Sequence, residues 1–234
     1  METEKQKIVI VGMGETAELA FDYFTNDSPY EVKAFAAEKK YLDANPGMDE
    51  KENLPVVALE DMERLFPPGE YLAFVAMSYV KLNHDRARFY ELVKNKGYIC
   101  ASYVSTQAFI GANVTIGENC FIFENNVLQR NVIIGNDVIL WSGNHIGHRT
   151  VIEDHVFLSS HVAVSGFCRI GAYCFLGINS ALGDNVTIGE NCFIGGGVAL
   201  MRDTKKNEIY RAVAQKPERL STKAVFGLDV GGAS

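Results

Sequence analysis

The chain has 234 residues, 47% hydrophobic and 22% charged, which is an ordinary composition for a soluble globular protein. Its net charge of −7 disfavours a general nucleic-acid-binding protein, which needs a basic face to displace counterions. The sequence has no apolar run of about eighteen residues, and its charged start lacks the apolar core of a signal peptide. We therefore expect a cytoplasmic protein without a membrane span.

A strand, a glycine-rich turn and a helix open the chain. Residues 8–11 form a buried-strand run, and Gly12-Met-Gly14-Glu-Thr-Ala17 leads from them into an amphipathic stretch that ends near Phe24. A GxGxxA turn in this context lets the backbone approach a phosphate and directs a helix N-terminus at it. We predict that Gly12, Gly14 and Glu15 bind a phosphate-bearing substrate.

Alternating strands and helices continue to about residue 101. We expect strands over 30–35, 54–57, 71–77 and 98–101, helices over 59–66 and from Ser78 to about Lys96, and a loop over 39–53. Glu38, after the second strand, either accepts hydrogen bonds from a ribose or base or is a plain surface charge. Glu38 and Ser78 join the predicted substrate-binding residues. Residues 1–101 thus form a predicted Rossmann-like domain for a nucleotide-linked sugar, because a single phosphate turn fits such a ligand better than NAD.

A six-residue repeat follows this domain. From Val104 to Leu200 every sixth residue, 17 in all, is Val, Ile or Leu. A period of six fits one short strand plus one turn, and three such units close a triangular coil in which residue i lies over residue i+18. We therefore predict a parallel β-helix over residues 102–202 and a C-terminal tail over 203–234.

The positions beside the aliphatic residue also repeat. Nine of the 17 following positions are glycine, and we expect these glycines to supply the backbone angles of tight turns. Four of the five cysteines lie two residues before an aliphatic position, where we interpret them as compact core residues. Phe123 and Trp141 are 18 residues apart at turn positions and are expected to stack. Their corner is either purely structural or shaped for a ligand, which makes Trp141 a candidate substrate-binding residue.

The glycine turn after a strand, about a hundred residues of α/β pattern and unbroken six-residue repeats together resemble the hexapeptide-repeat sugar O- and N-acyltransferases. These include sialic acid O-acetyltransferases and bacillosamine-pathway N-acetyltransferases. The segment Cys174-Phe-Leu-Gly-Ile-Asn-Ser180 is similar to the family's coil near the coenzyme. The resemblance covers nearly the whole chain. It implies a left-handed β-helix, a homotrimer, acetyl-CoA between neighbouring β-helices and a nucleotide-linked sugar in the front domain.

The resemblance also implies roles for single residues. His148 matches the histidine that serves as general base, but Arg149 stands where the family has an acidic residue that orients the ring. Gly166 matches the position whose backbone N–H faces the thioester oxygen. In the family's C-terminal segment near the coenzyme's nucleotide, Lys216 is retained and Ala214 replaces a proline.

The other histidines have alternative explanations. By the 18-residue rule His161 lies under Asn179, and both residues are either surface residues or coenzyme contacts. His145, near the aromatic corner, is a candidate for contact with the sugar. We expect His155 in a surface ladder and His84 at the start of a helix.

We predict an acetyl-CoA-dependent N-acetyltransferase of a nucleotide-linked amino sugar, used to build a surface polysaccharide such as lipopolysaccharide. Histidine is suited to remove the amine proton, and no Ser–His or Cys–His spacing suggests an acyl-enzyme, so direct attack is favoured. O-acetylation of a sugar hydroxyl is the first alternative, and a non-catalytic nucleotide-sugar-binding protein is the second. A zinc enzyme of this fold is disfavoured, and no metal site is expected, because all β-helix histidines lie within residues 145–161.

Overall fold

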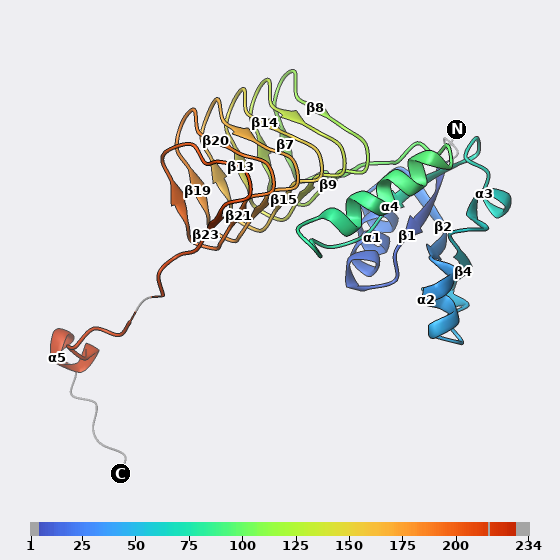
Figure 1. The fold of residues 1–234 in the computed structure, drawn as a ribbon, viewed down its shortest axis with the longest axis horizontal. Helices are drawn as coiled ribbons and strands as arrows, with labels where there is room; N and C mark the ends of the chain where they lie inside the picture. The colour runs from blue at the N-terminus through green and yellow to red at the C-terminus, as the bar shows by residue number, and fades with distance from the viewer. Residues whose placement is uncertain (1–4, 215, 228–234) are drawn as a thin grey trace, which may run out of the picture.

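The computed structural model describes residues 5–214 and 216–227. It contains an N-terminal α/β domain that lies beside a β-helix, and a C-terminal arm that leaves the far end of the β-helix (Figure 1). Within these described ranges no helix is both long and apolar enough to cross a membrane.

The N-terminal domain is built on a mostly parallel sheet with the strand order β3-β4-β2-β1-β5. Its strands are β1 (Gln6–Val11), β2 (Tyr30–Ala37), β3 (Glu50–Lys51), β4 (Leu54–Ala58) and β5 (Tyr71–Val75). Its helices are α1 (Glu15–Asn26), α2 (Lys39–Ala44), α3 (Met62–Leu65) and α4 (His84–Asn95). The apolar run 8–11 is buried in β1, between β2 and β5, as expected for a parallel strand covered on both faces.

Two predicted segments of this domain differ in the structure. Residues 39–53, predicted as a loop, contain α2 and the short antiparallel strand β3. Residues 39–44 include Lys, Leu and Ala, whose helix propensity outweighs the polarity that suggested a loop. The predicted strand 98–101 is reduced to a single bridge between Ala73 and Cys100.

Helix α4 starts later than the sequence predicted. The segment after Ser78 stays non-helical until His84, because Lys81, Leu82 and Asn83 have φ angles of 50°, 52° and 69°. Three successive residues in the left-handed region cannot belong to a right-handed helix.

The hexapeptide repeat forms the predicted left-handed parallel β-helix, with two-residue strands in three parallel sheets. The seven-stranded sheet contains β6 (Tyr103–Val104), β9 (Phe121–Ile122), β12 (Ile139–Leu140), β15 (Phe157–Leu158), β18 (Phe175–Leu176), β21 (Phe193–Ile194) and β23 (Ile209–Tyr210). The six-stranded sheet contains β7 (Phe109–Ile110), β10 (Val127–Leu128), β13 (His145–Ile146), β16 (Ala163–Val164), β19 (Ala181–Leu182) and β22 (Ala199–Leu200). The five-stranded β-helix sheet contains β8 (Thr115–Ile116), β11 (Ile133–Ile134), β14 (Val151–Ile152), β17 (Arg169–Ile170) and β20 (Thr187–Ile188).

The register follows the predicted stacking of residue i over residue i+18. Val127 pairs with His145, and His145 pairs with Ala163. The second residue of most strands points inward and builds the core, in which Leu140, Leu158 and Leu176 are fully buried. Strand β23 continues the seven-stranded sheet, so the β-helix extends beyond the predicted end at residue 202.

The turns differ from the expectation in one respect. Positive φ angles recur at every sixth residue from Asn113 to Gly197, two residues after the repeated glycine position. Seven of these positions are asparagine, which tolerates the left-handed region better than most residues. Most of the repeated glycines are needed for space instead: a Cβ atom on Gly147 would lie 2.4 Å from the backbone carbonyl carbon of Ser165 in the next coil. The predicted explanation of these glycines by turn angles is therefore wrong.

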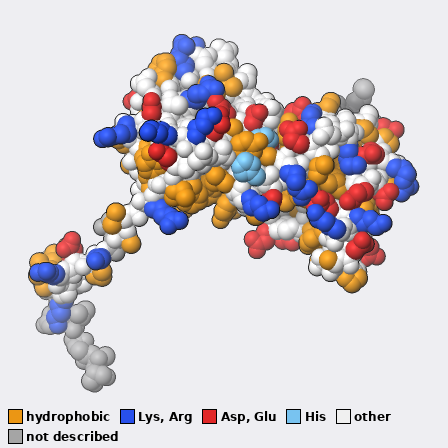
Figure 2. All heavy atoms as spheres, in the orientation of Figure 1, with side chains coloured by type: hydrophobic (Ala, Val, Ile, Leu, Met, Phe, Trp, Pro, Cys, Tyr) orange, Lys and Arg blue, Asp and Glu red, His pale blue; other side chains and the backbone are white. Residues whose placement is uncertain are grey.

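The N-terminal domain packs on the outer side of the seven-stranded sheet. There Phe157, Phe175 and Phe193 form a ladder, with ring centroids 5.4 Å and 4.9 Å apart along the stack. Tyr79 packs against Phe157 and Phe175. Figure 2 shows hydrophobic side chains gathered on the β-helix near the junction of the two domains, where histidine side chains also lie.

A buried ion pair joins the two domains. Arg86 on α4 and Asp137 on a β-helix turn are both fully buried, with 3.0 Å between Nε and Oδ1. Oδ2 of Asp137 lies 2.8 Å from Nδ1 of His155, whose ring stacks on Tyr173 one coil away. The ladder predicted for His155 is present, but the expected surface location is wrong, because the N-terminal domain covers this turn and leaves His155 only 7% exposed.

Candidate functional site

A cavity of about 660 Å³ lies between the N-terminal domain and the β-helix. It opens at the carboxyl ends of β1, β2 and β5, which is where open α/β sheets bind their ligands. Its volume lies within the range of roughly 300–1,000 Å³ that is usual for small-molecule sites.

The structure brings together at this cavity six of the seven residues predicted to bind substrate. They are Gly12, Gly14, Glu15, Glu38, Ser78 and Trp141. The seventh, His145, does not line the cavity: it lies on β13 with an exposed side chain on the outside of the six-stranded sheet. The glycine turn, the end of β2 and the aromatic corner thus line one cavity.

The glycine turn has the shape needed to approach an anion. Gly12 has φ +142°, and a Cβ atom there would lie 2.5 Å from the carbonyl oxygen of Ala76, so only glycine fits. Gly14 is the N-cap of α1 and has open space around its Cα, and no side chain caps the helix. An uncapped helix N-terminus attracts negative charge through its backbone N–H groups.

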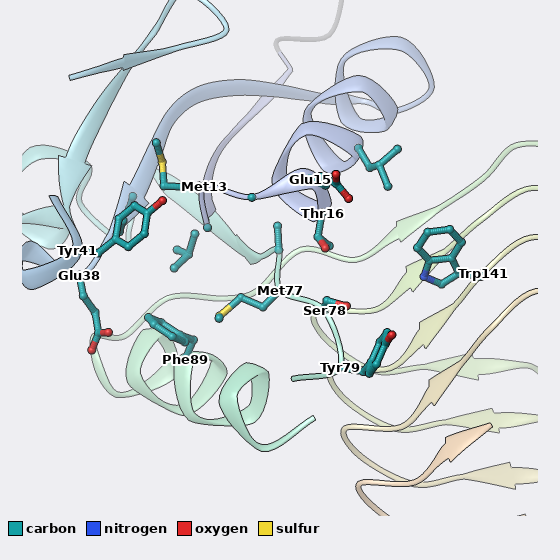
Figure 3. Close-up of a pocket in the computed structure, with 17 residues that line it drawn as sticks. Met13, Glu15, Thr16, Glu38, Tyr41, Met77, Ser78, Tyr79, Phe89 and Trp141 are labelled. Atoms are coloured by element: carbon teal, nitrogen blue, oxygen red, sulfur yellow. The ribbon is translucent and has the colours of Figure 1, made fainter. Parts of the chain in front are cut away.

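The cavity wall carries little positive charge. Among its described lining residues none is Lys or Arg, and the charged ones are Glu15 and Glu38. The groups suited to bind a phosphate are therefore the α1 N-terminus and the hydroxyls of Thr16 and Ser78, which lie in the middle of the cavity (Figure 3).

Glu38 lies at the end of the cavity that Tyr41 and Phe89 also line, away from Trp141 (Figure 3). Arg88 binds its carboxylate with both terminal nitrogens, at 2.9 Å and 3.2 Å, and Lys40 lies 3.0 Å away. The hydrogen bonds from Arg88, and secondarily Lys40, hold the pKa of Glu38 below its ordinary value. The carboxylate is therefore ionised at neutral pH and can only accept hydrogen bonds, including those of a sugar or base.

Trp141 and Tyr79 form the end of the cavity next to the β-helix (Figure 3). The Trp141 ring stacks on Phe123 with centroids 5.3 Å apart, as its 18-residue spacing predicted. The predicted stacking is therefore confirmed, and the contact of Trp141 with a ligand stays a prediction.

His148 lies on a different edge of the β-helix, on the exposed turn between β13 and β14. Its Nδ1 atom lies 3.1 Å from Oε1 of Gln129, and the same oxygen accepts its backbone N–H at 2.9 Å. The edge of its ring contacts Phe167 in the next coil, with centroids 4.9 Å apart. His148 does not line the cavity of its own chain.

Gly166 lies directly against His148. A Cβ atom on Gly166 would be 2.7 Å from Cε1 of the histidine ring, so glycine here leaves room for that ring. Its backbone N–H donates to Oδ1 of Asp184 at 3.0 Å. A thioester oxygen could use this N–H only if Asp184 released it.

The other predicted coenzyme residues are spread over the molecule. His161 and Asn179 are exposed on the turns that join the seven-stranded to the six-stranded sheet, and the His161 ring lies over Gly143. Lys216 is exposed on the arm that carries α5 (Thr222–Phe226), which lies apart from the β-helix (Figure 1). No group of three or more His, Cys, Asp or Glu residues in the described part of the chain could hold a metal ion.

Several residues of this region were missed from the sequence. Tyr41 and Phe89 reach the cavity only through tertiary packing, and nothing in their local sequence indicates it. Gln129 could have been found, because 129+18 is 147, the neighbour of His148. The phenylalanine ladder could also have been found, because its members recur at intervals of 18 residues.

Comparison with known proteins concerns the repeats first. Residues 113–148 and 167–201 match the model for the bacterial transferase hexapeptide (six repeats). A search of curated proteins found no match. The repeats and the fold fit the hexapeptide-repeat sugar acyltransferase family that the sequence resembles.

Solved structures share the whole two-domain fold. The acetyltransferase domain of PglB from Neisseria gonorrhoeae is 18% identical and has a TM-score of 0.76, over 88% of this chain and 96% of that one. PerB from Caulobacter crescentus, solved with CoA and GDP-perosamine, is 20% identical and has a TM-score of 0.75, over 87% and 92%. WeeI from Acinetobacter baumannii is 18% identical and has a TM-score of 0.71, over 86% and 94%. At these identities the likeness concerns the fold.

Proposed function

We propose that the protein is an acetyl-CoA-dependent N-acetyltransferase that acts on a nucleotide-linked amino sugar. The observation that carries this proposal is the cavity that runs from an uncapped helix N-terminus to Trp141 on the β-helix. A nucleotide bound at the glycine turn would direct its sugar toward the β-helix. The likeness to PerB, which binds CoA and GDP-perosamine, supports this assignment.

The outer side of the six-stranded sheet suits the coenzyme. Ala163, Ala181 and Ala199 form a strip of small side chains there, between the turns of His161 and His148. An extended pantetheine arm can lie along such a strip and use backbone and amide groups at its edges. The proposed coenzyme-binding residues are Gly166, His161, Asn179 and Lys216.

His148 is the proposed general base. The amine nitrogen attacks the thioester carbonyl carbon, so that a C–N bond forms as the C–S bond breaks. The amine proton passes to His148 Nε2 and then to the leaving thiolate. Two solved structures of perosamine N-acetyltransferase from Caulobacter crescentus carry a replacement of one histidine, which supports a role for a histidine.

The proposed active form is a homotrimer. In one chain His148 and the cavity lie on different edges of the β-helix, and in a trimer the base of one subunit would serve the cavity of its neighbour. His145, next to His148 and outside its own cavity, would then contact the neighbour's sugar. We assign the reaction to the synthesis of surface polysaccharide such as lipopolysaccharide, in the cytoplasm, where acetyl-CoA and nucleotide-linked sugars are available.

A thiol-release assay tests the proposal. Purified protein and acetyl-CoA are incubated with nucleotide-linked 3-amino, 4-amino and hydroxyl sugars, and free coenzyme A is followed with a thiol reagent. We expect release with one amino sugar. Release with hydroxyl sugars alone would replace the proposal by O-acetylation, and failure to bind coenzyme A would leave a nucleotide-sugar-binding protein.

A further inference from the structure

Gln129 lies one coil before His148 and touches it twice. Its Oε1 atom is 2.9 Å from the backbone nitrogen and 3.1 Å from Nδ1 of His148. Gln129 follows the aliphatic Leu128, at the repeat position that is most often glycine. A long polar side chain at this position therefore reaches across to the candidate base.

The backbone contact fixes which way the Gln129 amide points. A backbone N–H can only donate, so the atom that faces it must be the amide oxygen rather than the NH₂ group. The same oxygen faces Nδ1, and an amide oxygen can only accept. Nδ1 must then carry the proton for the contact to be a hydrogen bond, which leaves Nε2 with a free lone pair.

Resting on the proposed function, we propose that Gln129 is a positioning residue that holds His148 in the Nδ1–H tautomer with Nε2 available as the base. Gln129 would orient the His148 ring in this chain, in which Arg149 stands where the resembled family has an acidic residue. The Arg149 guanidinium lies 5.9 Å from the centre of the Phe167 ring, and that ring also contacts His148. The imidazole is thus held by a neutral acceptor and an aromatic edge.

Two substitutions test this inference. In Gln129→Ala the tautomer is no longer fixed, and we expect kcat to fall about 10–100-fold while KM for both substrates changes less than about threefold. Gln129→Glu retains the acceptor and should restore most of kcat. Its carboxylate also stabilises the imidazolium, so the acidic limb of the kcat–pH profile should move to higher pH.

The charged groups near this ring are Arg149 on its own turn, Arg130 one coil before and Asp184, which caps Gly166. They are unchanged in both variants, so a moved pH profile reports residue 129. The matched control is Gln107→Ala, an exposed glutamine on a turn of the first coil, for which we expect wild-type kcat and an unmoved profile. Melting temperature and oligomeric state are compared in all variants.

Imidazole nitrogen NMR of the full-length protein supplies a readout that needs no activity. The His148 signals, assigned with His148→Ala, should show the Nδ1–H tautomer in the wild type and a mixture in Gln129→Ala. A wild-type Nε2–H tautomer, or an unchanged kcat in Gln129→Ala, would overturn the inference. If the wild type acetylates no acceptor, the proposed function fails, and the NMR comparison alone decides the hydrogen-bond assignment.

Discussion

At the scale of single residues, the four β-helix histidines differ in their surroundings. His155 is buried in the domain junction, whereas His145, His148 and His161 are exposed. Of these exposed residues His148 has a hydrogen-bond acceptor at Nδ1 and a glycine against its ring. This combination leaves Nε2 open, which is the arrangement a general base requires.

His148→Ala should lower kcat of the proposed acetylation about 10²–10⁴-fold, because general-base catalysis contributes that much. KM for the sugar substrate should change little, because a general base acts mainly in the transition state and not in substrate binding. Steady-state kinetics of wild type and variant measure both constants. A variant with the wild-type rate and pH profile would remove His148 from the mechanism.

Gly166→Ala tests whether the glycine matters for space. The added Cβ would lie 2.7 Å from Cε1 of His148, so the ring must move while the fold is kept. A displacement of about 1 Å can reduce the rate about 10²-fold. We expect such a loss with an unchanged melting temperature; Gly183→Ala, which faces only the Met201 side chain closely, is the control.

Many of the residues that line the cavity were predicted from the sequence. The glycine turn, Glu38, Ser78 and Trp141 were predicted because strand ends and coil corners follow from simple periodicity. Tyr41 and Phe89 were not predicted, because their place at the cavity depends on how helices and coils meet in three dimensions. The Gln129 contact was not predicted either, although the 18-residue spacing indicates it. The location of His148 outside the cavity follows from coil geometry and was also not anticipated.

At the scale of elements, helix α1 is anchored to the first coil by its C-cap residue. Asp27 accepts hydrogen bonds from the Thr106 hydroxyl at 2.6 Å, the Thr106 backbone at 3.0 Å and the Tyr103 hydroxyl at 2.6 Å. The Thr106 hydroxyl, followed by Tyr103, lowers the pKa of Asp27 below its ordinary value. The anchor therefore depends on an ionised carboxylate.

This anchor gives a pH dependence of stability. A carboxylate with a lowered folded pKa stabilises the protein fully above its unfolded pKa, about 3.9 for Asp, and loses that effect as the pH falls through the lower folded value. Asp27→Asn should therefore lower the melting temperature at pH 7, and the difference from wild type should shrink below about pH 4. A difference that is constant from pH 7 to pH 3 would contradict this account.

The repeat itself was predicted nearly completely, since one period determines strands, turns and stacking. The start of α4 and the edge strand β3 were not predicted, because a left-handed segment and a two-residue strand leave no periodic signal in the sequence. The phenylalanine ladder was visible at intervals of 18 residues, but its role as the docking surface emerges only with the N-terminal domain present.

At the scale of the whole molecule, the buried pair of Arg86 and Asp137 joins the two domains. Removing one partner of a buried ion pair leaves an uncompensated charge, which costs about 3–5 kcal/mol. Arg86→Met should therefore lower the free energy of unfolding by about that amount, measured by urea denaturation. Arg88→Met on the same helix breaks an exposed pair with Glu38 and should cost at most about 1 kcal/mol. Equal effects of the two substitutions would contradict a special role for the buried pair.

Trp141 is the one tryptophan of the chain, and it lines the cavity while it stacks on Phe123. All indole fluorescence of the protein therefore originates at a single point in the cavity wall. A ligand of the proposed class that entered the cavity would change the polarity around this one fluorophore. The protein thus carries an intrinsic optical reporter, with which candidate ligands can be ranked by titration before any reaction is observed.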